Sequence, residues 1–510
     1  MDDGATLRTR LSLYLPPLPI VAAALMPLVV LIILASSTSP DLSERHLRIL
    51  GNSITLTALT VATSIAVGVP LALVTTSLRL RYASLAFALL AAPLAVPSYI
   101  GAFAYFAGTG PGGELERLLG IAVPEARGLA GSVWVMTLYT FPFVLLPVRA
   151  SLRRLDASQL DAARTLGLSP VQAFCRVVLP RIRGGVAAGG LLVALYTLSD
   201  FATPAILGLD TFTRAIYVEY NAFGLGEAAW LSLQLLGLVA IVIALESRFH
   251  TVSEPAGRSL FWQPGRALAT VVWAAVASVS FAAIGLPVAL FVVWIFREGV
   301  AGFDPAIIGS SLFPSLLAAV VAVLAALPLA RAARAGPFGR FLVRLTSYGF
   351  GVPGIVMGTA LVYVGLRLPG LYQTTAMLVL GYVLRFLPLA TGTVRDGFAR
   401  IDAKLPHAAR SLGATPTEAF RRVTLPLLFP ALLSGAALVF LEAMRELPLT
   451  LLLRPTGTET LATRLWQVYE AGYFGDAAVP GLLLMGVSLL AMVAYIRGES
   501  ILGVAATPDA

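Results

Sequence analysis

Apolar stretches of about 20 residues recur along the whole chain and are separated by short polar segments. Each stretch is long enough for a helix that crosses a bilayer, so the pattern predicts twelve membrane-spanning helices. Their expected positions are near 11–35, 54–78, 84–107, 129–149, 185–207 and 229–246 in the first part of the chain, and near 268–296, 310–330, 342–365, 375–393, 428–453 and 478–496 in the second. The first stretch resembles a secretory signal, but it is longer than the apolar core of one, which favours a retained helix.

The composition agrees with a chain that lies largely in lipid. Of 510 residues, 58% are hydrophobic and 12% are charged, and the mean hydropathy is +0.85. A soluble protein of this length needs more polar surface, and a disordered chain contains fewer apolar residues. We therefore predict an all-α polytopic membrane protein and exclude a disordered chain or a soluble globular enzyme.

The positions of the basic residues predict the orientation in the membrane. The formal charge is +9, with seven arginines in 149–183 and five arginines and one lysine in 395–422. Cytoplasmic loops collect such residues, so both segments and both chain termini are expected in the cytoplasm. No basic stripe with interleaved aromatic residues occurs, so nucleic acid is not an expected partner. The single cysteine and three scattered histidines give no disulfide and no metal-ligand spacing.

An internal repeat divides the chain into two halves. Segment 141–180 matches segment 387–426 at a constant offset of 246, with 18 of 40 positions identical. Asp200 and Glu446 align at the same offset. Because six predicted helices separate the two segments, the halves have the same orientation and form a parallel repeat.

Each repeated segment is a basic loop with two short helical stretches. Gly167 and Gly413 separate the stretches, as expected of a residue that adopts the left-handed conformation without strain. Leu155, Leu160 and Leu166 are spaced to form one apolar face in the first loop. The pattern predicts an amphipathic knob in each half, which either rests on lipid headgroups or binds a partner.

The knobs resemble the EAA loops of permease subunits of ATP-binding-cassette importers with the type I fold. In that family the pattern is Glu-Ala-Ala, three residues, Gly, nine residues, then Ile-x-Leu-Pro. The residues at these spacings are Asp161, Ala162, Ala163, Gly167, Leu179 and Pro180 in the first loop, and His407, Ala408, Ala409, Gly413, Leu425 and Pro426 in the second. Asp161 and His407 depart from the family's glutamate, which leaves open the polar contact of that first side chain.

The resemblance implies that each loop forms a coupling helix that docks on a separate ATPase subunit. The chain has no G-x-x-x-x-G-K-[ST] loop, so this chain is expected to bind no cofactor and to have no catalytic residue. The implied partners are a homodimer of ATPase subunits, which would use ATP and magnesium, and a periplasmic or lipid-anchored substrate-binding protein. The implied location is the bacterial inner membrane, with lipid around a multi-pass chain.

The resemblance also implies the domain limits. We expect a cytoplasmic tail and first helix over 1–49, a linker with the seventh helix over 248–304, and a cytoplasmic tail over 498–510. The two copies of the type I transmembrane domain are expected over 50–247 and 305–497.

Ionisable residues within the apolar stretches form a second group of candidates. They are Asp200 in the first half and Arg385, Glu442, Arg445 and Glu446 in the second. Charged groups at membrane depth are costly and often functional, which favours a gate or a pathway lining. The alternative is that the arginines pair with the carboxylates and only tie helices together. Tyr99, Tyr105, Tyr348 and Tyr363 are further pathway candidates.

The solute is suggested by resemblance alone. Segments 200–220 and 445–478 resemble ferric-iron permeases, which are fused two-half proteins, and fused thiamine permeases look similar. Polyamine, molybdate and sulfate permeases are more distant. Two other classes remain possible from the pattern: an ion-gradient-driven transporter, which also has parallel repeats, and an intramembrane enzyme, for which no catalytic set is found.

Overall fold

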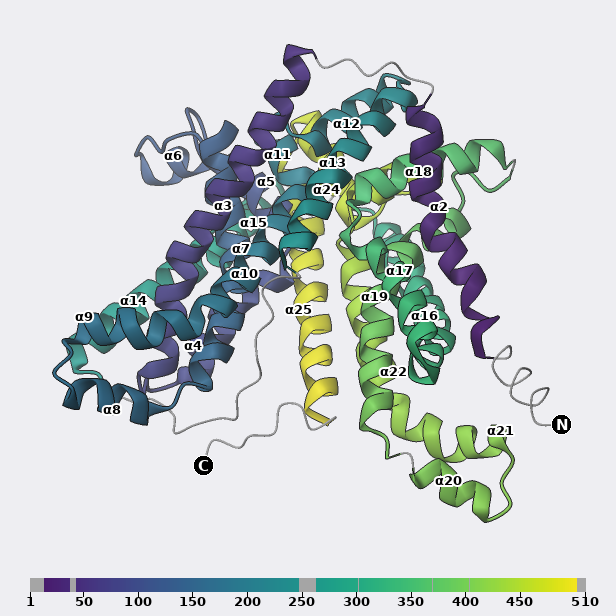
Figure 1. The fold of residues 1–510 in the computed structure, drawn as a ribbon. Helices are drawn as coiled ribbons and strands as arrows, with labels where there is room; N and C mark the ends of the chain where they lie inside the picture. Colours follow the sequence, from purple (N-terminus) through teal and green to yellow (C-terminus); the bar gives the residue numbers. More distant parts are fainter. Residues whose placement is uncertain are drawn as a thin grey trace.

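The computed structural model describes residues 13–36, 43–246, 263–300, 302–368, 370–402 and 404–501, and the regular elements in this part of the chain are helices (Figure 1). Ten helices in it are long and apolar enough to cross a membrane, or eleven if one bent pair counts as a single span. They are Pro17–Ala35, Glu44–Ser77, Gly128–Arg153, Val171–Ser199, Leu225–Leu245, Arg266–Glu298, Ala306–Ala335, Thr375–Arg400, Pro416–Met444 and Phe474–Val493. Residues 248–262 and 301 of the expected linker, and 502–510 of the expected C-terminal tail, lie outside the described residues.

The difference from twelve continuous spans lies in the third span of each half, which is broken. In the first half, α4 (Ala83–Ala91) and η1 (Ala92–Ala95) are bent by 87° from α5 (Ser98–Gly108). In the second half, α17 (Pro337–Gly351) ends before α18 (Gly354–Arg367) begins. Both breaks fall at a Val-Pro pair, since proline disfavours helical geometry in the residue before it.

The remaining elements of the two halves follow the same order. The first half contains α3 (Glu44–Ser77), α6 (Glu114–Leu119), α7 (Gly128–Arg153), α8 (Ala157–Thr165), α9 (Pro170–Ala173), α10 (Leu179–Ser199), α11 (Ala202–Ile206), α12 (Phe212–Asn221) and α13 (Leu225–Glu246). The second contains α16 (Ala306–Ala335), α19 (Thr375–Arg400), α20 (Lys404–Ser411), α21 (Pro416–Ala419), α22 (Leu425–Met444), α23 (Pro448–Leu453), α24 (Leu461–Ala471), the short η5 (Phe474–Ala477) and α25 (Ala478–Ile501).

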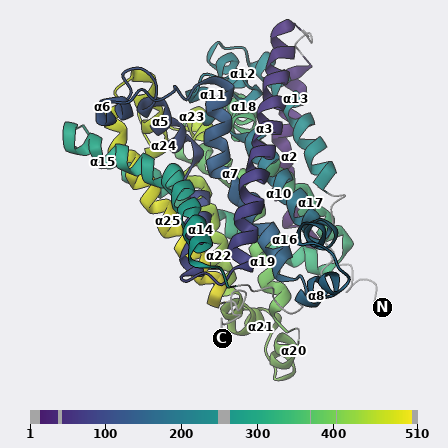
Figure 2. The same ribbon diagram turned by 90° about the vertical axis from the view of Figure 1, so that its left-hand side faces the viewer.

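The first span of each half packs against the other half. Helix α2 (Pro17–Ala35) contacts α17 and α18 as well as α13. The seventh span, α14 (Arg266–Ser280) with α15 (Leu286–Glu298), contacts α4 and α5 of the first half (Figure 2). The two halves are therefore joined by exchanged helices as well as by the chain itself.

Candidate functional site

The first loop folds into two short helices around a left-handed glycine. Asp156 begins α8 by accepting the Ser158 backbone N–H at 3.0 Å, and Gly167 ends it at φ +80°. Ser169 then begins α9 as a capping box, because its hydroxyl accepts the Gln172 N–H at 3.3 Å and the Gln172 side chain accepts the Ser169 N–H at 3.0 Å.

The second loop repeats this geometry with other residues. Gly413 lies at φ +92°, and an added Cβ would meet nothing within 4 Å at this position. Thr415 and Glu418 form the capping box of α21, with bonds of 3.3 Å and 2.9 Å. The two glycines are therefore required by backbone conformation and not by crowding.

The two knobs differ in how much of their apolar face is buried. Leu155 and Ala163 of the first knob are buried, whereas Leu166 is 82% exposed. Leu412, which aligns with Leu166, is 89% exposed, and no side chain of α20 is buried. His407 and Ala408 are exposed and Ala409 is half-buried; nothing is described of the Asp161 side chain. Each knob thus presents a leucine outward beside its glycine.

A π-helical turn connects each knob to the following membrane helix. Phe174–Val178 precedes Leu179 and Pro180, and Phe420–Thr424 precedes Leu425 and Pro426. Proline has no N–H and clashes with the carbonyl four residues earlier, so the hydrogen bond before it shifts to five residues. The Leu179 N–H accordingly bonds to the Phe174 carbonyl, and the Leu425 N–H to the Phe420 carbonyl. Both knobs lie at the same end of the molecule (Figures 1 and 2).

Asp200 lies between α10 and the short helix α11, two residues before α11 begins. Its carboxylate accepts the Thr203 N–H at 3.1 Å and the Thr203 hydroxyl at 2.8 Å. Ser98, the first residue of α5, donates its hydroxyl to the same carboxylate at 2.5 Å, and Tyr196 donates to Ser98 at 3.1 Å. Among the described residues, no arginine forms an ion pair with Asp200. The carboxyl group is held by the Ser98 and Thr203 hydroxyls and by the Thr203 N–H.

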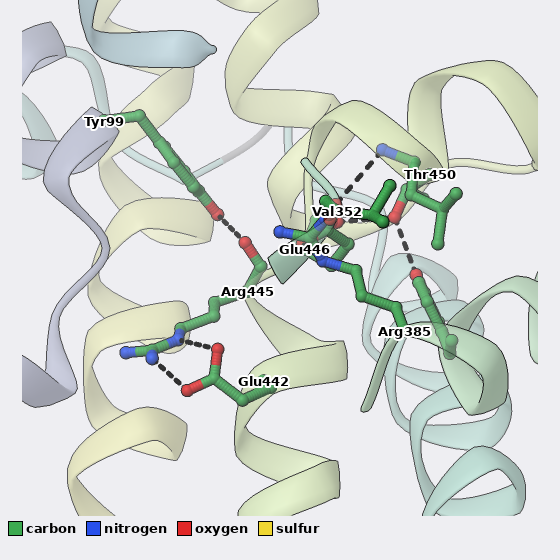
Figure 3. Close-up of polar contacts among 9 residues, drawn as sticks. Tyr99, Val352, Arg385, Glu442, Arg445, Glu446 and Thr450 are labelled. Atoms are coloured by element: carbon green, nitrogen blue, oxygen red, sulfur yellow. Dashed lines mark hydrogen bonds and ion pairs between the residues drawn. The ribbon is translucent and has the colours of Figure 1, made fainter. Parts of the chain in front are cut away.

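Glu446 has the equivalent place at α23, with a cation added. Its carboxylate accepts the Leu449 N–H at 3.2 Å and lies 3.4 Å from the Arg385 guanidinium (Figure 3). Arg385 also donates to the Val352 carbonyl at 2.6 Å, immediately before the break in the third span. Gly354 takes the place of Ser98 here, since a Cβ at 354 would collide with the Glu446 carboxylate.

Glu442 and Arg445 form a third group at the end of α22. Nε and Nη2 of Arg445 donate to the two oxygens of the Glu442 carboxylate, and Nη1 donates to the Leu94 carbonyl of the first half at 2.7 Å. Tyr99 donates its hydroxyl to the Arg445 carbonyl at 3.3 Å (Figure 3). The Arg445 and Glu442 side chains are 18% and 21% exposed.

Four of the five predicted charged residues thus form two ion pairs, Arg385 with Glu446 and Arg445 with Glu442. The fifth, Asp200, has no arginine partner among the described residues. Sequence reasoning missed the partners Ser98, Tyr196 and Gly354. Two features of the sequence indicate these residues. Ser98 and Gly354 each follow the Val-Pro pair of a third span, and the offset of 246 aligns Tyr196 with Glu442. Tyr105 bonds to the Ala282 carbonyl of the seventh span at 3.0 Å, and nothing is described of the Tyr348 side chain.

No group of three or more metal-ligating side chains occurs among the described residues. The described residues instead form two exposed knobs at one end of the molecule and a group of ionisable side chains at the broken spans.

Comparison with known proteins assigns this arrangement to a family. The pattern described as "Binding-protein-dependent transport system inner membrane component" matches residues 8–259 and 321–497. The Fe(3+)-transport system permease protein FbpB 2 of Haemophilus influenzae is 29% identical over 383 residues, which are 70% of this chain and 74% of that protein. The probable ABC transporter permease protein y4fN of Sinorhizobium fredii is 28% identical over 86% of this chain and 84% of its own. A probable molybdenum ABC transporter permease protein of Haloferax volcanii is 32% identical over 38% of this chain and 72% of its own.

Proposed function

Because the chain belongs to the family of binding-protein-dependent transport system inner membrane components, it is a multi-pass ABC importer permease, and we propose that its solute is ferric iron. It contains two copies of the permease unit, so one chain would provide the whole translocation pathway. It is a transport subunit and not an enzyme, and we propose that separate ATPase subunits supply the energy.

The observation that carries the coupling proposal is the pair of matched knobs at one end of the molecule. Each has an outward leucine, Leu166 or Leu412, beside a left-handed glycine. Two equivalent apolar knobs fit two equivalent grooves, which supports a homodimer of ATPase subunits as the partner. In the proposed cycle, closure of that dimer on ATP and magnesium moves both knobs, and the π-helical turns pass the movement to α10 and α22.

The same arrangement supports an orientation. The two basic loops, the start of α2 and the end of α25 lie at one end of the molecule (Figure 1). The positive-inside rule then places this end in the cytoplasm of an inner-membrane protein. The opposite end would receive solute from the binding protein. The exposed apolar side chains of the spans, such as Leu316 and Leu324, would contact lipid.

The coupling proposal is tested by replacing Gly167 and Gly413 with valine. A branched residue at positive φ costs roughly 1–2 kcal/mol or more at each knob, although the space around it is open. We expect solute uptake and binding-protein-stimulated ATP hydrolysis to fall together, by about tenfold or more. Gly392→Ala is the matched control, because Gly392 lies within α19 and a Cβ there meets nothing within 4 Å. Undiminished uptake and stimulation in the double variant would show that the knobs are not couplers.

Two observations support ferric iron as the solute. The Haemophilus relative that transports Fe(3+) matches over both halves of the chain. In addition, Arg385 and Arg445 are each paired with a glutamate, whereas Asp200 has no cationic partner among the described residues. These five residues are three acids and two arginines, so they offer a cation one carboxyl group that has no arginine partner.

The solute is tested by uptake in cells that contain this chain with its ATPase and binding protein. We expect labelled ferric iron to accumulate, and thiamine, spermidine and molybdate not to do so. Molybdate is the specific rival, because the Haloferax relative is named for molybdenum. Uptake of molybdate without iron would overturn the iron assignment and leave the permease assignment intact.

A further inference from the structure

The break in the third span of the first half is held from two sides. On its own half, Ser98 donates to Asp200. On the other half, the Leu94 carbonyl accepts from Arg445 at 2.7 Å, and the Tyr99 hydroxyl donates to the Arg445 backbone at 3.3 Å. Two hydrogen bonds of opposite direction therefore join the segment 94–99 to the end of α22.

Glu442 fixes the geometry of this contact. It lies one turn before Arg445 on α22 and binds the guanidinium through both carboxylate oxygens. The third guanidinium nitrogen is then directed at Leu94, so the arginine is oriented before it reaches the first half. The pair is largely buried, which strengthens the bond to a carbonyl compared with the same bond in water.

The break in the second half is held differently. Arg385 caps the Val352 carbonyl and pairs with Glu446, and all three residues belong to the second half. The sequence explains the asymmetry, because the repeat offset places Ser199 opposite Arg445 and Tyr139 opposite Arg385. A serine at 199 has no long cationic side chain that could cross to the second break.

We propose that Leu94, Tyr99, Glu442 and Arg445 form a latch between the halves, and that Arg445 is a positioning residue for the transport cycle. The inference rests on the proposed function, because it assigns the latch to one of two alternating states. Alternating access moves one repeat against the other. A displacement of 1–2 Å at the interface would break a directional bond of this kind. The latch then stabilises the conformation described here, and its release accompanies the change to the other state.

The latch predicts a population shift when its bonds are removed. Loss of one charge-assisted bond that exists in only one state shifts a two-state equilibrium by about tenfold. In Arg445→Gln we expect basal ATP hydrolysis by the assembled transporter, without binding protein, to change by about that factor. Tyr99→Phe removes only the neutral bond and should give a smaller change in the same direction.

A distance measurement tests the latch on the permease alone, without the ATPase or the solute. Cys175, which is exposed, is replaced by serine, and Phe223→Cys with Tyr473→Cys carries spin labels. These positions are 94% and 71% exposed and belong to opposite halves. We expect Arg445→Gln and Tyr99→Phe to move part of the label–label distance distribution to a second peak.

Two control variants remove equivalent bonds that do not join the halves. Arg214→Gln breaks an exposed ion pair with Asp210, and Tyr382→Phe removes a hydroxyl bond to Thr450 within the second half. Both should keep the original distance distribution. An unchanged distribution in folded Arg445→Gln, or in folded Tyr99→Phe if the arginine variant does not fold, would overturn the latch. Absence of any ATPase assembly with the wild-type chain would instead contradict the proposed function.

Discussion

At the scale of single residues, the charged groups in the apolar part of the chain are structural caps as well as functional candidates. Asp200 and Glu446 each lie two residues before a short helix, α11 or α23, and accept a backbone N–H from its first turn. The repeat offset predicted that the two acids are equivalent, but not what they do. Ser98 was missed because a pattern of apolar residues does not show that the third span breaks beside Asp200.

The cap and the charge of Asp200 can be separated by two substitutions. Asparagine keeps one oxygen that can accept the Thr203 N–H, but its amide nitrogen replaces the oxygen that accepts the Ser98 and Thr203 hydroxyls. Asp200→Asn should therefore lower the free energy of unfolding by less than Asp200→Ala does. Asp200→Ala removes the cap and should cost about 1–2 kcal/mol. Because both variants remove the charge, we expect both to reduce iron uptake, by about tenfold. Thermal unfolding in detergent and uptake in cells are the measurements, and full uptake by Asp200→Asn would limit this residue to capping.

At the scale of elements, the two loops were the part most open to sequence reasoning. Their glycines, their helical stretches and their matching positions follow from local rules for turns and caps. The π-helical turns were not predicted, although the Leu-Pro pairs that cause them were visible. The broken third spans were missed for a related reason: hydropathy counts apolar residues, and it ignores the bend that a Val-Pro pair imposes.

The capping box of α21 predicts how much the stability of this short helix depends on one hydroxyl. Thr415→Ala removes the hydroxyl that accepts the Glu418 N–H and should destabilise the start of α21 by about 1 kcal/mol. Hydrogen exchange of the α21 amides should accelerate about fivefold, and ATPase stimulation should weaken. Thr417→Ala is the control, because Thr417 is exposed and lies outside the capping box. Equal exchange in the two variants would show that docking, and not the cap, orders this helix.

At the scale of the whole molecule, the exchanged first spans bind the halves together. The seventh span shows how. Pro287 leaves the Ala283 carbonyl without its helical donor, and Tyr139 of the first half supplies a hydroxyl at 2.6 Å. Tyr105 does the same for Ala282. The sequence predicted two parallel halves from the repeat, but the exchange depends on contacts between residues that are more than 100 positions apart.

This exchange predicts that the chain can be divided without loss of assembly. When residues 1–246 and 247–510 are co-expressed as separate chains, α2 and the seventh span should each bind the opposite piece, and the pieces should co-purify. A first piece that begins at residue 43 lacks α2 and leaves its contact surface on α17 and α18 uncovered, so the yield of the complex should fall severalfold. Tyr139→Phe tests the contact between the first half and the seventh span, because the loss of one hydroxyl bond should weaken the association of the two pieces by about 1 kcal/mol. Size-exclusion chromatography of the purified pairs measures all three. If each piece ran alone as a folded monomer, the exchanged helices would not be what joins the halves, and the covalent link would have to do so.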